Sequence, residues 1–348
     1  MDTMAEEEAR VTVGVDTHGE VHVAAVLDER GKLLGTQSFP TTVNGHRRLV
    51  TWACGFGIVV AVGVEGTGAW GAGVARYLTT EGFRVLEVDR PDRRTRRKRG
   101  KSDIIDAEAA ARAVQAGTAS GIPKARNGAV EAIRALRVAR RSAVKSRSQA
   151  ALQLHSLVST APDELREELR TLKFGDLIAR CARFRSVDPA AAVSATKRAL
   201  RSIARRWFVL DREIAELDAT LEPLVRTAAP NLLQMNGVGT DVAGQLLVTA
   251  GDNPDRLRSE AAFAHLCGVS PIPASSGRTD RHRLNRGGDR QANAALYRVV
   301  LCRLRWDPRT IAYAERRTKS GLTKPEILRC LKRYVAREIY QELCRLPG

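Results

Sequence analysis

The sequence predicts a mixed α/β region in the first third of the chain and a helical region in the remainder. Short alternating or continuous apolar runs, typical of strands, lie before residue 90. Beyond residue 128, apolar side chains recur with the three- and four-residue spacing of helices. A length of 348 residues suits two or three domains. We expect an α/β domain at 1–120, a helical middle at 121–228 and a helical C-terminal domain at 229–348.

The first third begins with three successive strands, at residues 11–16, 21–28 and 32–39. Turns at Gly19 and Arg30-Gly31 join them into a meander. There follow a helix at 43–54, a strand at 58–65, a helix at 69–81, a strand at 84–89 and a helix from 103. The continuous apolar strand between helices indicates a central strand covered on both faces. This order of elements is that of the ribonuclease H-like fold, the fold of Holliday-junction resolvases.

Four acidic residues lie at the boundaries of these elements. Asp16 closes the first strand and Glu65 closes the fourth. Asp103 and Asp106 are three residues apart at the start of a helix, so they share a face. Four converging carboxylates repel one another unless a cation lies between them, and Mg²⁺ takes oxygen ligands. The pattern therefore predicts a Mg²⁺ site.

The middle of the chain carries a heptad pattern, which predicts a coiled coil. Its apolar positions are Leu200, Ile203, Trp207, Leu210, Ile214, Leu217, Leu221 and Leu224, and Pro223 falls near the end. An earlier helix at about 128–160 has apolar residues on one face and arginines on others. The two helices could pack as an antiparallel hairpin or against another subunit. The segment 161–190, with Pro162, Gly175 and Pro189, interrupts them.

The net charge of +18 indicates a nucleic-acid partner, because a basic protein gains affinity by displacing counterions from phosphates. One dense basic run leads directly into Asp103, and its position favours phosphate binding over a merely solvated loop. Its candidate contacts are Arg93, Arg94, Arg96, Arg97, Lys98, Arg99 and Lys101. Gly237 and Gly239 lie between two helical stretches, as in a helix-hairpin-helix that binds phosphate, although an ordinary helix-helix turn gives the same pattern.

A second group of candidate residues lies at 267–290. Ser275, Ser276 and Gly277 precede a cluster of arginines, Arg278, Arg281, Arg283, Arg286 and Arg290. A serine hydroxyl is a weak nucleophile unless a base takes its proton or nearby charge stabilises the reaction, and arginines can do the latter at a phosphoryl centre. His18 and His282 are possible general bases, or else surface histidines that contact phosphate.

The remaining composition argues against other classes. The six cysteines are scattered with no Cys-x-x-Cys pair, which disfavours a zinc site or a disulfide framework and favours a reducing compartment. No apolar run reaches the roughly 18 residues of a membrane span, and the acidic N-terminus is unlike a signal peptide. A cytoplasmic protein is expected.

Together these residues resemble the DEDD-type transposases of bacterial insertion sequences, a family described as bridge-RNA-guided serine recombinases. The matching segments are Val13–Asp16, Val64–Gly68, Lys101–Ala107, Gln234–Gly239 and the Ser276-Gly277 loop. The resemblance implies that the four carboxylates hold Mg²⁺ and that Ser276 attacks the scissile phosphate to form a transient phosphoserine link to DNA. Ser275 is the adjacent alternative.

The resemblance also implies partners. These are double-stranded DNA at the element ends and target, a structured guide RNA, and further copies of the chain in a dimer or tetramer. Two other functions stay open. One is a metal-only nuclease of the junction-resolvase type, whose C-terminal half only grips DNA. The other is a non-catalytic nucleic-acid-binding protein, which the presence of all four acidic residues disfavours.

Overall fold

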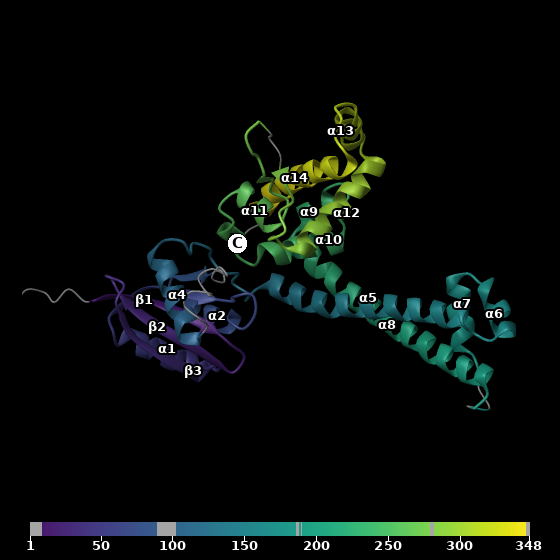
Figure 1. Ribbon diagram of the computed structural model, residues 1–348, viewed down its shortest axis with the longest axis horizontal. Coiled ribbons are helices and arrows are strands. Elements are labelled where there is room, and N and C mark those ends of the chain that lie inside the picture. Colours follow the sequence, from purple (N-terminus) through teal and green to yellow (C-terminus); the bar gives the residue numbers. More distant parts are fainter. Residues whose placement is uncertain (1–8, 89–101, 186–187, 189, 279–281, 346–348) are drawn as a thin grey trace, which may run out of the picture. The chain divides into compact units, whose positions relative to one another are not determined.

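The structure is a computed structural model that describes residues 9–88, 102–185, 188, 190–278 and 282–345. It divides into two compact units (Figure 1). The N-terminal unit joins Met1–Gly128 with Ala250–Leu266, and the helical unit joins Ala129–Thr249 with Cys267–Leu346. No helix of the described residues is both long enough and apolar enough to cross a membrane.

A five-stranded sheet forms the centre of the N-terminal unit, in the order β3-β2-β1-β4-β5. Its strands are β1 (Arg10–Thr17), β2 (Val21–Asp28), β3 (Leu33–Pro40), β4 (Ile58–Glu65) and β5 (Val85–Val88). The first three are antiparallel neighbours, and β4 runs parallel to both β1 and β5. The predicted mixed α/β architecture and the meander are therefore confirmed.

Three helices cover the two faces of this sheet. Helices α1 (Val43–Cys54) and α2 (Ala72–Thr80) pack on one face, where Leu78 of α2 shares a core with Val13 and Val62 of the strands. Helix α4 (Asp103–Gln115) packs on the other face, where Ala107 and Ala110 are buried. The burial of β4 between helices agrees with its apolar sequence. Helix α2 begins three residues later than predicted, because turns occupy residues 66–71.

A segment from the C-terminal third completes the N-terminal unit. It contains a 3-10 turn, η1 (Pro254–Arg256), and helix α11 (Glu260–Leu266). Asn253 Nδ2 donates to the Pro123 carbonyl at 3.1 Å, and Arg256 Nη1 donates to the Ile122 carbonyl at 3.2 Å. These bonds tie residues that are more than a hundred positions apart in the chain, which the sequence pattern did not indicate.

The helical unit is built on two long helices, α5 (Ala129–Ser159) and α8 (Ala192–Ala228). Arg140 pairs with Asp218, and Arg147 pairs with Asp211 farther along, so the two helices run antiparallel (Figure 1). The hairpin alternative is therefore the one observed within the chain. All eight predicted heptad positions of α8 are buried or half-buried. Pro223 lies inside α8.

The interrupting segment folds into two short helices, α6 (Asp163–Arg170) and α7 (Phe174–Ala182). Leu165, Leu169 and Leu177 form a local core with Leu154 and Leu200 of the long helices. Pro162 directly precedes α6, and Gly175 lies in the first turn of α7, so this segment is a packed helical subdomain, while Pro189 lies outside the described residues.

The rest of the helical unit consists of α9 (Pro230–Gln234), α10 (Thr240–Ala250), α12 (Arg290–Trp306), α13 (Pro308–Lys319) and α14 (Lys324–Leu343). A small hairpin of β6 (Ile272–Pro273) and β7 (His282–Arg283) precedes α12. The predicted glycine turn joins α9 to α10, and Gly237 adopts a φ of +81° that only glycine takes readily.

Candidate metal centre and nucleic-acid-binding residues

Strand pairing brings Asp16 and Glu65 to one edge of the sheet. β1 and β4 are parallel neighbours, and Val15 pairs with Val64. Asp16 and Glu65 follow this pair directly, so both carboxylates leave the sheet at the carboxyl ends of adjacent strands. Both residues are buried, with 6% and 8% of their surface exposed. The Thr17 hydroxyl donates to the Glu65 carbonyl at 2.8 Å and fastens the two strand ends together.

Helix α4 supplies the other two carboxylates. Ser102 caps its N-terminus by accepting a hydrogen bond from the Ile105 N–H at 3.3 Å, so the helix begins at Asp103. The helix can lie close to the sheet because the strand positions beneath it are glycines. A Cβ at Gly14 would lie 2.1 Å from the Ala107 carbonyl oxygen, and one at Gly63 would lie 2.9 Å from that of Ala110.

Three side chains form a cluster that could hold a cation. His18 Nε2 lies 3.1 Å from Asp16 Oδ2 and 3.3 Å from Asp103 Oδ1. Each of these residues offers one ligand atom, and the three atoms lie within 4.8 Å of one another. The structure therefore brings Asp16 and Asp103 together as the sequence predicted, and adds His18 between them. The sequence offered His18 only as a possible base or phosphate contact.

Electrostatics at this cluster favour a cation. Burial raises the pKa of Asp16, and the neighbouring charges of Asp106 and Asp103 raise it further, while His18 opposes them. Asp106 is itself buried, with 5% of its surface exposed. A set of three mutually repelling carboxylates and one imidazole fits a divalent metal, because its charge offsets the repulsion and the oxygens suit a hard ion.

Arg126 supports the loop that follows Glu65. Its Nη2 donates to the Gly68 carbonyl at 3.0 Å, and its own carbonyl accepts from Arg76 Nη1 at 3.2 Å. Arg126 has a φ of +53°, a conformation that is costly for a residue with a side chain. Sequence reasoning missed this residue, since an isolated arginine in a loop gives no local signal.

The second predicted group lies in the β6–β7 hairpin. Ser275, Ser276 and Arg278 are exposed in the loop between the two strands, while His282 and Arg283 form β7. Arg286 is exposed just after the hairpin. Arg281 and the basic run containing Arg93, Arg94, Arg96, Arg97, Lys98, Arg99 and Lys101 lie outside the described residues.

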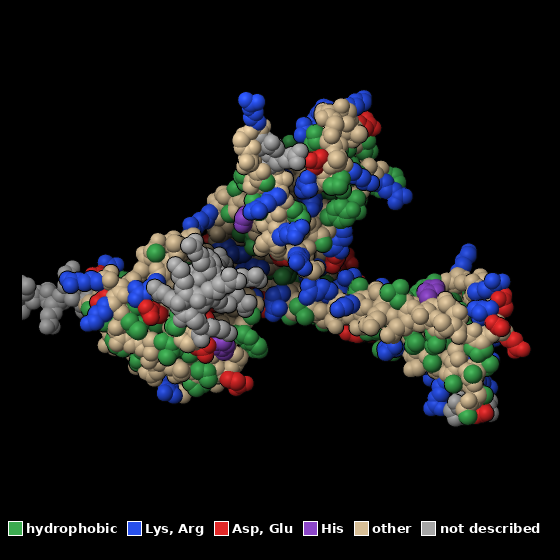
Figure 2. All heavy atoms as spheres, in the orientation of Figure 1, with side chains coloured by type: hydrophobic (Ala, Val, Ile, Leu, Met, Phe, Trp, Pro, Cys, Tyr) green, Lys and Arg blue, Asp and Glu red, His purple; other side chains and the backbone are tan. Residues whose placement is uncertain are grey.

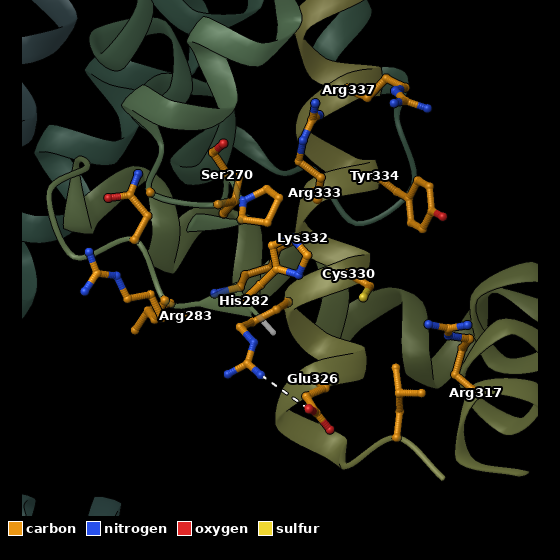
Figure 3. Close-up of a pocket in the computed structure, with 17 residues that line it drawn as sticks. Ser270, His282, Arg283, Arg317, Glu326, Cys330, Lys332, Arg333, Tyr334 and Arg337 are labelled. Atoms are coloured by element: carbon orange, nitrogen blue, oxygen red, sulfur yellow. Dashed lines mark ion pairs between the residues drawn. The ribbon is translucent and has the colours of Figure 1, made fainter. Parts of the chain in front are cut away.

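A groove of about 860 Å³ lies between this hairpin and α14 (Figure 3). His282 and Arg283 line it from β7, and α14 contributes Lys332, Arg333 and Arg337. Lys and Arg side chains are also spread over the visible face of the helical unit (Figure 2). Part of the basic character predicted from composition therefore lies on a described, hollowed surface.

Two family models match the chain and define its class as transposases. One, a DEDD transposase model of the IS110 type, matches residues 13–161, and the other, described as the transposase IS116/IS110/IS902 family, matches residues 229–315. The chain belongs to the IS110 family of insertion-element transposases. The family implies use of a divalent metal, and the predicted ribonuclease H-like fold is consistent with it.

Two insertion-element proteins are similar over part of the chain. The insertion element IS900 uncharacterized 42 kDa protein of Mycobacterium paratuberculosis is 28% identical over 42% of this chain and 37% of its own length. The insertion element IS110 uncharacterized 43.6 kDa protein of Streptomyces coelicolor is 34% identical over 34% of this chain and 29% of its own. The matched region thus spans about a third of each relative.

Proposed function

We propose that this transposase cleaves and rejoins DNA strands, with Asp16, Glu65, Asp103 and Asp106 holding Mg²⁺ in a ribonuclease H-like domain. The observation that carries the proposal is the gathering of Asp16 and Asp103 around His18, with buried Asp106 acting on the charge of Asp16. These residues come from two segments that are far apart in the chain. Nothing in the stability of the sheet requires three carboxylates to converge there.

The chemistry would be divided between two sets of residues. A divalent cation bound at the carboxylates would polarise the scissile phosphate and stabilise negative charge on the leaving oxygen. Asp16 and Glu65 are held rigidly by paired strands, and the Asp103 end of α4 by close packing on Gly14. Such fixed ligands suit a reaction that depends on positioning.

Ser276 is the proposed nucleophile. Its hydroxyl oxygen would form a bond to phosphorus as the bond to one DNA strand breaks, and the leaving oxygen would take up a proton. A strand hydroxyl would then attack the phosphoserine, restore a phosphodiester and release the serine. The exposed position of Ser276 in the hairpin loop, next to Arg278, supports access to a phosphate.

The proposal also includes a homo-oligomer and a guide RNA. Ser276 and the acidic cluster belong to different compact units, so a homodimer or tetramer in which they come from different subunits is compatible with the chemistry. The proposed specificity comes from a structured RNA that pairs with donor and target DNA, in the bacterial cytoplasm at the nucleoid. Sequencing of RNA that copurifies with the protein tests this part: one structured species supports it, and random host RNA contradicts it.

A metal-only nuclease is the second candidate function. It is favoured by one observation, that Asp16, His18 and Asp103 all belong to the N-terminal unit. Such an enzyme would use water as the nucleophile, and the helical unit would only bind DNA. The two mechanisms differ in whether a covalent protein–DNA species forms.

The Ser276→Ala variant separates the two mechanisms. Wild type and variant are incubated with Mg²⁺ and labelled DNA carrying the element ends, and denaturing gels resolve free strands from protein-linked DNA. We expect the wild type to form a protein-linked species and Ser276→Ala to form neither that species nor cleaved strands. Ser275→Ala is the matched control and should retain both. Unchanged cleavage by Ser276→Ala would establish the metal-only mechanism instead.

A further inference from the structure

The groove between the β6–β7 hairpin and α14 has an unusually one-sided charge. Among the described residues that line it, the cationic side chains are Arg283, Arg317, Arg329, Lys332, Arg333 and Arg337. The carboxylate among these lining residues belongs to Glu326, which lies 3.9 Å from Arg329. Cations gathered on concave walls repel one another, so the arrangement favours an anionic ligand that follows the groove.

Lys332 adds an observation that points to a ligand. Only 8% of its surface is exposed, and its Nζ donates to the neutral amide oxygen of Asn293 at 2.8 Å. Among the described residues, no carboxylate forms an ion pair with Lys332. Burial and the nearby charge of Arg329 lower the pKa of Lys332. A buried ammonium with a neutral partner gains stability when an anion approaches.

Asn293 holds this lysine in a fixed place. Its Nδ2 donates to the carbonyls of Cys267 and Gly268, at 3.1 and 2.9 Å, which turns its oxygen toward Lys332. Arg317, on the α13 side of the groove, has a buried Nε without a hydrogen-bond partner in the described part of the chain. Donors that are positioned and incompletely satisfied are typical of a built anion site.

Tyr334 gives the groove an aromatic surface. It is 47% exposed, and it lies between Arg333 and Arg337 along α14 (Figure 3). Tyr313 supports its ring edge-on, with ring centroids 5.5 Å apart. An exposed aromatic ring beside arginines is the arrangement on which bases of a single strand stack while the cations contact its phosphates. Bases in a duplex are stacked on one another and do not present a free face.

We propose that this groove binds a single strand of nucleic acid, with its phosphates at Arg283, Lys332, Arg333 and Arg337 and one base stacked on Tyr334. The same hairpin that carries Arg283 into the groove carries Ser276 in its loop. This binding needs neither the metal nor the serine chemistry, so it can be tested apart from the proposed transposase activity.

The test is binding of fluorescent 12-nucleotide RNA and DNA strands, and of the matching DNA duplex, to the full chain in EDTA. We expect tighter binding of at least one single strand than of the duplex. Tyr334→Ala should weaken that binding about tenfold, since stacking on an aromatic ring commonly contributes that much. Tyr334→Phe should bind like the wild type, because it keeps the ring.

The Arg333→Ala/Arg337→Ala variant tests the phosphate contacts. The logarithm of the binding constant falls linearly with the logarithm of the salt concentration, and each single-strand phosphate contact adds roughly 0.7 to the steepness of that slope. Loss of two contacts should therefore reduce the steepness by roughly 1.4. The variant's matched control is Arg205→Ala/Arg212→Ala, which removes two exposed arginines of α8. Circular dichroism confirms that each variant is folded.

A cross-link locates the base directly. A strand carrying 5-iodouracil should photocross-link to the peptide containing Tyr334 in the wild type and lose that product in Tyr334→Ala. Equal binding by wild type, Tyr334→Ala and the α14 double variant would overturn the proposal. Preference for the duplex, with no cross-link at Tyr334, would also overturn it. A single-strand preference for RNA or for DNA supports the proposal and identifies the strand.

Discussion

At the residue scale, Asp16 combines burial with two like-charged neighbours, which is unfavourable for folding without a cation. Its burial and the charges of Asp103 and Asp106 all act against its ionised form. His18 opposes these effects, because its charge and its hydrogen bond favour the ionised form of Asp16. The sequence located Asp16 because a carboxylate at the end of an apolar strand has no packing role. It could not show that His18 lies between Asp16 and Asp103.

Asp16→Asn should therefore separate stability from metal binding. In EDTA its thermal unfolding midpoint should equal or exceed that of the wild type, because a neutral amide removes part of the repulsion. Added Mg²⁺ should raise the midpoint of the wild type and leave that of Asp16→Asn nearly unchanged. An equal Mg²⁺-induced rise in both proteins, measured by differential scanning calorimetry, would show that the metal binds elsewhere.

A second residue-scale feature is the buried histidine pair of β2 and α1. His22 and His46 stack with ring centroids 5.6 Å apart, and the His46 ring contacts Tyr77. His22 Nδ1 and His46 Nε2 lack hydrogen-bond partners among the described residues. Burial lowers the pKa of His22 to about 4, helped by the charges of His46 and His18. Burial and Arg76 lower the pKa of His46 in the same direction.

This pair predicts a loss of stability in acid. In the unfolded chain His22 becomes protonated below about pH 6.5. In the folded chain it stays neutral until the pH falls to about 4. The free energy of unfolding should therefore fall as the pH drops across this interval, by about 3 kcal/mol for His22 alone. Urea unfolding at pH 7 and pH 4.5 measures the change. His22→Phe should show a smaller fall, and equal falls in both proteins would refute the assignment.

At the element scale, the contact of α4 with the sheet positions Asp103 and Asp106 beside the end of β1. The helix lies directly over Gly14 and Gly63. The sequence predicted a helix from about residue 103, and the structure shows that it begins at Asp103 with Ser102 as its cap. The sequence could not predict the depth of packing, because the importance of a strand glycine appears only when its neighbour is known.

Gly14→Ala should displace α4. The added methyl would meet the Ala107 carbonyl oxygen at 2.1 Å, and a backbone atom cannot move aside without shifting the helix. We expect a loss of about 3 kcal/mol in the free energy of unfolding, together with weaker metal binding. Gly68→Ala is the matched control, since nothing lies within 4 Å of its Cβ position. Equal stability of the two variants in urea unfolding would contradict this account of the packing.

For the long helices α5 and α8, the sequence predicted the buried face of α8 but not the helix on which it packs. The spacing of Leu200, Ile214 and Leu221 predicted a buried stripe, and all three are buried. The choice of partner depends on ion pairs such as Arg140–Asp218, which join residues far apart in the chain. Periodicity describes one helix at a time, so the pairing with α5 required the structure. The prediction of a coiled coil with another subunit stays untested.

At the scale of the whole molecule, segments that are far apart in the sequence belong to the same compact unit. Residues 251–266 follow α10 in sequence, yet they complete the N-terminal unit through bonds to residues 120–123. Composition along the sequence can suggest boundaries between consecutive domains. It cannot show that a segment from late in the chain packs in the first unit. The nearness of Asp16 and Asp103 was predictable, because both carboxylates lie at local boundaries between elements.

The central claim is that the carboxylates at the ends of β1 and α4 hold the metal that drives DNA cleavage. Its most direct test replaces Asp103, which is exposed at the edge of the cluster, by cysteine, since a thiolate binds Mg²⁺ poorly and softer ions better. Cleavage of labelled element ends is measured with Mg²⁺ and with Mn²⁺. The account predicts that Asp103→Cys is inactive with Mg²⁺ and recovers with Mn²⁺, whereas the wild type cleaves with both. Full activity of Asp103→Cys with Mg²⁺ would contradict it.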